Sequence, residues 1–244
     1  IRASYVKHIS TMLQLSGQSK VEADQAASEI LKLETTLAIA SMDRVAMRDP
    51  YATYHKMTLA DFTKSSPGIN WNSQMAELGV SRVDSILVAQ PEFFKKLASL
   101  VKSEPITTWK EYFRYKLVAS TASSLGDKFQ EESFDFNGRI LNGAKVQEQR
   151  WERETSTIDY FMGEALGQEY VKIAFPPAAK VRMLELIGNL KLAFAERIQG
   201  LDWMSAETKV KALKKLNTIM VKVGYPDKWL DYSKLEIIKG DNFG

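Results

Sequence analysis

Along most of its length this sequence repeats one pattern, in which apolar residues recur at three- and four-residue spacing and are followed by short polar breaks. The spacing matches one face of an α-helix, which turns once every 3.6 residues. In residues 1–16 the apolar positions that share a face are Tyr5, Ile9, Met12 and Leu13. Gly17 follows, at the position where a left-handed residue commonly ends a helix. The pattern predicts a chain built mainly from α-helices.

Capping residues and prolines indicate where the helices begin. Ser19 and Glu22 form a Ser-x-x-Glu capping box before a second helix, which we expect to reach about Met42. Pro176-Pro177 opens a long helix that should run to about Gln199, because proline fits the first helical turn, where its missing amide is not needed. Cap residues precede three more helical runs, at Thr58, Thr108 and Ser205.

Other segments complete the expected fold. Helical spacing also predicts helices in residues 70–78, 92–102, 129–142 and 147–166. The apolar stretches 85–89 and 219–223 are too short to show a period, so each fits a strand as well as a helix. We predict a mainly α fold: a multi-helix orthogonal bundle of about nine or ten helices with at most short token strands. A chain of 244 residues can bury its core as one large domain or two small ones.

The composition excludes several classes of protein. The net charge is +3, from 33 basic and 30 acidic residues, and the charges are scattered, so a nucleic-acid-binding surface is not indicated. The absence of Cys excludes disulfides and thiolate metal sites. No apolar run approaches the roughly 18 residues that a membrane-spanning helix needs. We therefore expect no nucleic-acid partner and no membrane segment in this chain.

The first residues bear on how the chain begins. Ile1 already stands in an amphipathic pattern with Arg2 and Lys7, which is not typical of a signal peptide. The sequence also lacks an initiator Met. We therefore expect it to begin inside a longer polypeptide.

A hydrolytic zinc site would need imidazoles and carboxylates that converge on one ion, commonly as His-Glu-x-x-His on a helix. The chain has two histidines, His8 and His55, and neither stands in that motif. We interpret both as surface or packing residues. Glu131 and Asp135 fit the Glu-x-x-x-Asp spacing of some zinc peptidases, but 30 acidic residues produce such spacing by chance. Solvated charge is the better interpretation of this pair.

Other chemistries find as little support. There is no Gly-x-Ser-x-Gly elbow, no Cys nucleophile and no phosphate-binding glycine motif. Paired carboxylates that meet only in space are not visible in a sequence, and that class stays open. A basic run is interpreted as an ordinary solvated helix face, and the tryptophans as packing residues. These residues are Lys209, Lys211, Lys214, Lys215 and Lys222, and Trp71, Trp109, Trp151, Trp203 and Trp229.

Five short strings are more specific than the composition. In chain order they are Arg48-Asp49-Pro50 with Tyr54-His55-Lys56-Met57-Thr58-Leu59, then Val88-Ala89-Gln90-Pro91-Glu92-Phe93, Gly167-Gln168-Glu169-Tyr170-Val171, Leu201-Asp202-Trp203-Met204-Ser205-Ala206-Glu207-Thr208-Lys209, and Val223-Gly224-Tyr225-Pro226-Asp227. They resemble passages of the neprilysin and endothelin-converting-enzyme family of zinc metalloendopeptidases, such as R-D-P…Y-x-x-M-T-L and L-x-W-M-x-x-x-T-K. The resemblance covers essentially the whole chain, and five strings in the family's order make chance an inadequate explanation.

The resemblance implies a mainly helical region that precedes the catalytic part of a zinc endopeptidase. In this family a helical domain faces a thermolysin-like catalytic domain across a cavity, and by narrowing entry it favours oligopeptides over folded proteins. Residues 1–244 are therefore expected to form a helical, substrate-restricting (lid) domain segment of a larger peptidase. Zinc and oligopeptide substrates would be bound by the full-length parent. No position here matches the family's zinc ligands, so we assign no catalytic, cofactor-binding or metal-ligating residue to this segment and expect it to be inactive alone.

One departure from the family is informative. Animal members carry a Cys shortly after a Trp-Arg-Arg run, where this sequence has Trp151-Glu152-Arg153-Glu154. With no Cys there or elsewhere, the chain resembles a bacterial member built without disulfides. An animal-type ectodomain on a membrane stalk is therefore not expected. A cysteine-free chain is compatible with any redox compartment, and we expect a periplasmic or cell-envelope location rather than a cytoplasmic one.

Three functional hypotheses remain. The first is that the parent cleaves peptide bonds with a zinc-activated water, while this segment supplies the wall of the cavity. The second is a stand-alone helical binding or scaffolding module. The third is a basic nucleic-acid binder, for which binding would weaken steeply with added salt; we expect no such binding.

Overall fold

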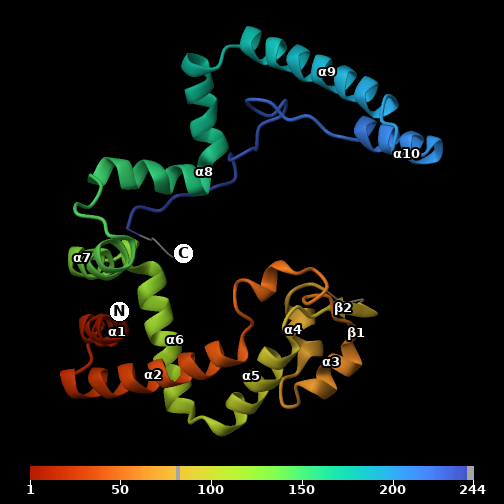
Figure 1. The fold of residues 1–244 in the computed structure, drawn as a ribbon. Coiled ribbons are helices and arrows are strands. Elements are labelled where there is room, and N and C mark those ends of the chain that lie inside the picture. Colours follow the sequence, from red (N-terminus) through yellow and green to blue (C-terminus); the bar gives the residue numbers. More distant parts are fainter. Residues whose placement is uncertain (81–82, 241–244) are drawn as a thin grey trace. The chain divides into compact units, whose positions relative to one another are not determined.

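The computed structural model describes residues 1–80 and 83–240 (Figure 1). The chain divides into two compact units, residues 1–147 (unit 1) and residues 148–244 (unit 2). Ten α-helices, two 3-10 helices, one π-helix and a single two-stranded sheet make up the regular structure of the described residues. The predicted mainly α fold with token strands is confirmed. None of the helices in these residues has the length and apolar character needed to cross a bilayer.

Unit 1 holds most of the elements. They are α1 (Arg2–Leu15), α2 (Lys20–Ala40), η1 (Ala46–Arg48), β1 (Lys56–Thr58), α3 (Leu59–Ser65), α4 (Trp71–Glu77), β2 (Ser85–Leu87), α5 (Pro91–Ser103), α6 (Ile106–Thr121), η2 (Ala122–Ser124), α7 (Asp127–Ser133) and the π-helix η3 (Phe134–Leu141). Unit 2 contains α8 (Arg150–Ala174), α9 (Pro177–Gln199) and α10 (Ala206–Asn217).

Local signals start and stop the first two helices as predicted. Gly17 has φ = +102°, a left-handed conformation that favours glycine and turns the chain out of α1. The Ser19 side chain accepts a hydrogen bond from the Glu22 amide, and the Glu22 carboxylate accepts one from the Ser19 amide at 3.1 Å. This capping box satisfies amides that the first turn of α2 leaves without helical partners.

The core of unit 1 lies between α1 and α2. The predicted face of α1 is confirmed, because Ile9, Met12 and Leu13 are each 0% exposed. They pack against the apolar face of α2, of which Ile30 is also 0% exposed, and Tyr115 of α6 joins the same cluster. Burial of large aliphatic side chains stabilises each by about 1.5 to 3 kcal/mol relative to exposure, so this cluster holds the three helices together.

The small sheet confirms a strand in residues 85–89. β1 and β2 run antiparallel, with Met57 opposite Ile86. The other ambiguous stretch, residues 219–223, forms neither helix nor strand.

Thr108 does not cap a helix, as we had predicted. α6 begins at Ile106, directly after Pro105, and Thr108 lies inside its first turn. The Thr108 side chain is 4% exposed and donates a hydrogen bond to Oε2 of Glu29 at 3.3 Å. The Thr108 hydroxyl therefore bonds to α2 and does not cap α6.

The helix predicted over residues 129–142 divides into α7 and the π-helix η3. A Cβ atom at Gly138 would overlap the Phe134 ring. The glycine therefore lets this ring fold back along the wider turns of η3. The predicted end near Gly143 is confirmed, and this residue has φ = +71°.

The helix predicted over residues 147–166 is longer than expected and bent. α8 continues to Ala174 and has a kink at Met162 (φ −132°, ψ +33°). Gly167 lies inside α8, and the Trp229 ring packs on it, about 3.4 Å from the place where a Cβ would stand.

Burial in α2 gives a direct test of this core. Ile30→Ala should lower the free energy of unfolding by about 2 to 5 kcal/mol, because it leaves a cavity among buried neighbours. Ile39→Ala in the same helix is the matched control, since Ile39 is 80% exposed, and its effect should stay within about 0.5 kcal/mol. Urea unfolding followed by circular dichroism measures both changes. Equal effects would show that the α1–α2 contact is not the core.

Candidate functional site

His8 is a buried packing residue of α1. Its side chain is 2% exposed, and its Nδ1 lies 2.9 Å from Oε1 of Glu132 in α7. The imidazole stacks on the Phe136 ring of η3, with ring centroids 4.6 Å apart. These contacts tie α1 to α7 and η3.

A second polar cluster in unit 1 centres on the partly buried Glu34. Its carboxylate accepts a hydrogen bond from the Tyr5 hydroxyl at 2.6 Å and pairs with Nζ of Lys116 at 2.6 Å. Burial, together with the bond to Glu34, raises the pKa of Tyr5 above its usual range. Burial alone would lower the pKa of Lys116, but the hydrogen bond and charge of Glu34 outweigh it, and the net shift is upward. Tyr5 and Lys116 therefore keep their protons at neutral pH, as a structural network requires and an acid–base site does not.

His55 and the Glu131–Asp135 pair lie in different segments of unit 1. Nδ1 of His55 is 3.1 Å from the carbonyl oxygen of Val88, which joins the start of β1 to the end of β2. Glu131 is exposed on α7, whereas Asp135 is in η3 and pairs with Arg139. The structure thus brings neither histidine to the Glu-x-x-x-Asp pair.

These donors do not fit a zinc site. A tetrahedral site needs three or four convergent His, Cys, Asp or Glu groups. In residues 1–80 and 83–240 no group of three or more such side chains could hold a metal ion. Nδ1 of each histidine is also within hydrogen-bond distance of a partner inside the fold, Glu132 for His8 and the Val88 carbonyl for His55.

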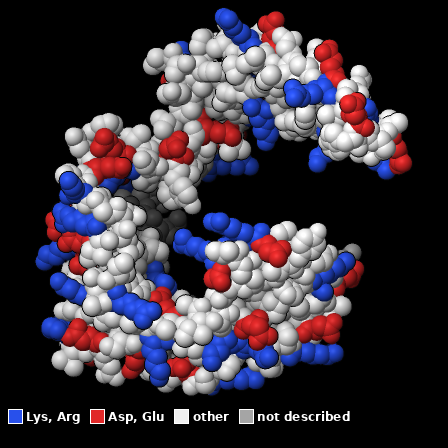
Figure 2. Space-filling view, in the orientation of Figure 1, with Lys and Arg blue, Asp and Glu red and all other residues white. Residues whose placement is uncertain are grey.

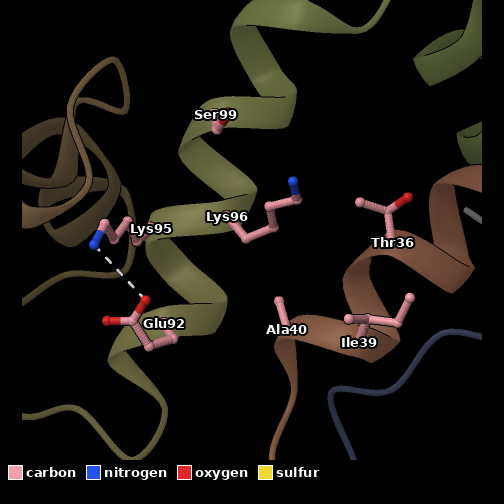
Figure 3. Close-up of a pocket in the computed structure, with 7 residues that line it drawn as sticks. All are labelled: Thr36, Ile39, Ala40, Glu92, Lys95, Lys96 and Ser99. Carbon is pink, nitrogen blue, oxygen red and sulfur yellow. Dashed lines mark ion pairs between the residues drawn. The ribbon is translucent and has the colours of Figure 1, made fainter.

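A groove of about 560 Å³ separates the C-terminal part of α2 from α5 (Figure 3). It is lined by Thr36, Ile39, Ala40, Glu92, Lys95, Lys96 and Ser99. Lys95 pairs with Glu92 at 3.7 Å, and the Lys96 side chain extends toward Thr36. The groove thus combines aliphatic and cationic side chains on two exposed helices, without a nucleophile and base in contact.

Surface charge is mixed rather than segregated. On the face shown in Figure 2, basic and acidic side chains alternate over both units. In α10, Nζ of Lys211 pairs with Glu207 at 2.6 Å, and Nζ of Lys209 donates to the Gln199 carbonyl at 2.7 Å. This arrangement agrees with the interpretation of the lysine run as a solvated helix face.

The most developed polar contact in unit 2 joins α9 to the segment after α10. Nζ of Lys180 donates hydrogen bonds to the Tyr225 carbonyl oxygen at 2.8 Å and to Oδ1 of Asp227 at 2.7 Å. The same ammonium lies 4.4 Å from the centroid of the Tyr225 ring, and the Lys180 side chain is 15% exposed. The hydrogen bond from Lys180 also lowers the pKa of Asp227. We call this contact between Lys180 and residues 223–230 the Lys180 clasp.

Two further contacts hold the clasp against α8. Gly224 has φ = +67°, and a Cβ there would overlap the Phe175 ring at the end of α8. The Leu230 amide donates a hydrogen bond to Oε2 of Glu164 at 2.6 Å. Trp229 stacks on Tyr225 with centroids 5.7 Å apart. The segment is therefore fixed along its length by side chains that precede it by 45 residues or more.

Comparison with known proteins identifies the family. Residues 1–226 match the sequence pattern of peptidase family M13. The chain belongs to this family. The predicted resemblance to neprilysin and the endothelin-converting enzymes is confirmed, and residues 1–244 correspond to the N-terminal helical region of the M13 peptidases.

The relatives include animal and bacterial peptidases. Human endothelin-converting enzyme 1 is 28% identical over 99% of this chain and 32% of its own length, and mouse membrane metallo-endopeptidase-like 1 is 29% identical over 95% and 32%. The open state of Mycobacterium tuberculosis zinc metalloprotease Zmp1 is 38% identical over 98% of this chain and 38% of its own, with a TM-score of 0.82. PepO of Lactobacillus rhamnosis shares the fold, with a TM-score of 0.77 at 18% identity.

The match covers only part of the length of each relative. The chain spans about a third of the length of the curated M13 relatives. Both solved relatives named above are bacterial, in line with the bacterial assignment that the missing Cys favoured.

Two of the family-like strings meet in the Lys180 clasp. Residues 223–227 form it, and Gly167, from the string in α8, packs against Trp229 just beyond them. Lys180 itself was not singled out from the sequence. In the sequence it is an ordinary basic residue in a predicted helix, and its partner Tyr225 lies 45 residues further along the chain.

Gly224 tests the backbone of the clasp. Gly224→Ala should destabilise the clasp by about 2 to 4 kcal/mol, because it combines left-handed strain with overlap of the Phe175 ring. Gly188→Ala in α9 is the control, since a Cβ there meets nothing within 4 Å and alanine favours a helix by about 1 kcal/mol. Hydrogen exchange at the Leu230 amide should become faster in the first variant and stay unchanged in the second. Unchanged exchange in Gly224→Ala would contradict the observed contact.

Substitution of Lys180 tests the polar contacts of the clasp. Lys180→Met removes a cationic donor from the Tyr225 carbonyl, at a cost of about 1 to 2 kcal/mol. Limited trypsin digestion should then cleave after Lys228, inside the clasp, about five to thirty times faster, because cleavage follows the open population. Lys211→Met, which removes an exposed pair within one helix, should leave that rate unchanged. Equal rates in all three proteins would rule out the clasp as a stabilising contact.

Proposed function

We propose that this chain is the helical part of a zinc-dependent metalloendopeptidase in which it forms a wall of the substrate cavity. The observation that carries the proposal is the family match over residues 1–226, combined with a donor set that does not fit zinc in the described residues. In this proposal the segment binds no metal and is inactive alone. The parent binds zinc through residues outside this chain, in the two thirds of the polypeptide that the relatives have beyond this match.

The physical properties of unit 1 suit such a wall. Its core is closely packed, and its polar side chains are used in ion pairs and hydrogen bonds between helices. A rigid helical layer of this kind limits the size of the molecules that can enter the cavity. The layer itself takes no part in the reaction.

The location of the protein is also part of the proposal. We infer a periplasmic or cell-envelope location, with which a cysteine-free chain is compatible, as it is with any redox compartment. Fractionation of cells that express the parent tests it, because recovery in the cytoplasmic fraction would contradict it.

Peptidase activity tests the function. The whole parent should cleave a fluorogenic oligopeptide, lose that activity with a chelator and regain it with Zn²⁺. The 244-residue chain alone should show neither cleavage nor bound zinc by elemental analysis. Metal-dependent cleavage by the chain alone would overturn the assignment of the zinc site, and an inactive parent would favour a binding or scaffolding role.

A further inference from the structure

One face of α9 carries a continuous apolar stripe. Its members recur at three- and four-residue spacing, which places them on one side of the helix. They are Met183, Leu186, Ile187, Leu190 and Phe194, and we call them the α9 stripe. Four of them are between 38% and 59% exposed, and Ile187 is half-buried. From Met183 to Phe194 the stripe is about 16 Å long, at 1.5 Å per residue.

The side of α9 away from the stripe holds the polar residues Arg182, Glu185, Asn189 and Glu196, and the exposed apolar residues Val181 and Leu192 lie beside them. The α9 stripe differs from that side because no charged residue lies among its members. Amphipathic helices of this kind bury the apolar side in the finished protein.

Within unit 2 the α9 stripe is covered at one end only. Ile198 extends the stripe by one turn and is 6% exposed, in the part of α9 that packs on α10. The buried hydrophobic side chains described in this unit are Ile198 and Leu216 of α10. An exposed face of several large side chains in a row marks a contact surface.

We propose that the α9 stripe is an internal helix-packing surface of the whole peptidase, and that its partner is an amphipathic helix from the part of the polypeptide outside residues 1–244. This inference rests on the proposed function. The relatives reproduce this fold, with a TM-score of 0.82 over 98% of the chain, in polypeptides more than twice as long. The stripe also continues a contact that already exists, between α9 and α10. A partner on the same polypeptide is held at high effective concentration, which favours it over a second copy.

The inference orients α9 within the cavity wall. If the stripe is buried against another helix, the polar face with Arg182, Glu185 and Glu196 is the side left for solvent and substrate. The apolar side is then part of the support of the wall rather than its lining.

Thiol labelling tests the inference directly, because this chain contains no Cys. Leu190→Cys places a thiol in the stripe, and the matched control Asn189→Cys places one on the polar face one residue away. Each variant is made in the whole parent and reacted with a maleimide, and the rate is divided by the rate in urea. We expect protection of at least tenfold for L190C and less than threefold for N189C, with the unsubstituted parent as background. Leu186→Cys repeats the test at a second position in the stripe.

The outcomes separate this inference from the proposed function. Rapid labelling of L190C and L186C in a parent that still cleaves peptide would overturn the inference and leave the function standing. Protection in a parent without peptidase activity would support the inference and overturn the function. Protection in the 244-residue chain alone would overturn the inference, and sedimentation velocity would then distinguish a second copy from residues 1–147 as the cover.

Discussion

The packing of α1 against α2 is the contact on which the rest of unit 1 depends. Both helices present faces that are completely excluded from solvent, centred on Ile9, Leu13 and Ile30. α6 and α7 pack onto α1, and α5 packs onto α2, so the first two helices place these three, while α3 packs on α5 and α4 on α3. The free energy of burying aliphatic side chains is proportional to the area buried and does not depend on direction. The arrangement of the helices must therefore be specified by the fit between side-chain shapes.

Polar side chains add that specificity to unit 1. The His8–Glu132 and Tyr5–Glu34–Lys116 contacts each join helices that are distant in the sequence. Buried polar groups are costly when unpaired, so these pairs favour one arrangement of helices over others that would bury the same apolar area. The one buried histidine is thereby used in structure.

Unit 2 is organised differently. It has few buried apolar side chains, and its most specific contact is the polar clasp around Lys180. The clasp fixes the path of residues 223–230 along α8, while the α9 stripe stays open. A unit with strong local anchors and little core of its own depends on a neighbour for its hydrophobic burial. This difference explains why the proposed partner surface is in unit 2, whereas unit 1 has a packed core of its own.

The sequence by itself determined where most helices begin and end, which faces of α1 and α2 are buried, and the family. The signals for these are local: a capping box acts over three residues, a left-handed glycine over one, and helical spacing over four. It also indicated that His8 and His55 stand outside any zinc motif, since motif spacing is local as well. Tertiary structure alone decided that Thr108 bonds to Glu29 rather than capping α6 and that the Trp229 ring packs on Gly167 of α8. It also decided that Lys180 holds a motif 45 residues away. Thr108, Gly167 and Lys180 each contact a residue from a distant part of the chain, and the position of that residue exists only once the helices have packed.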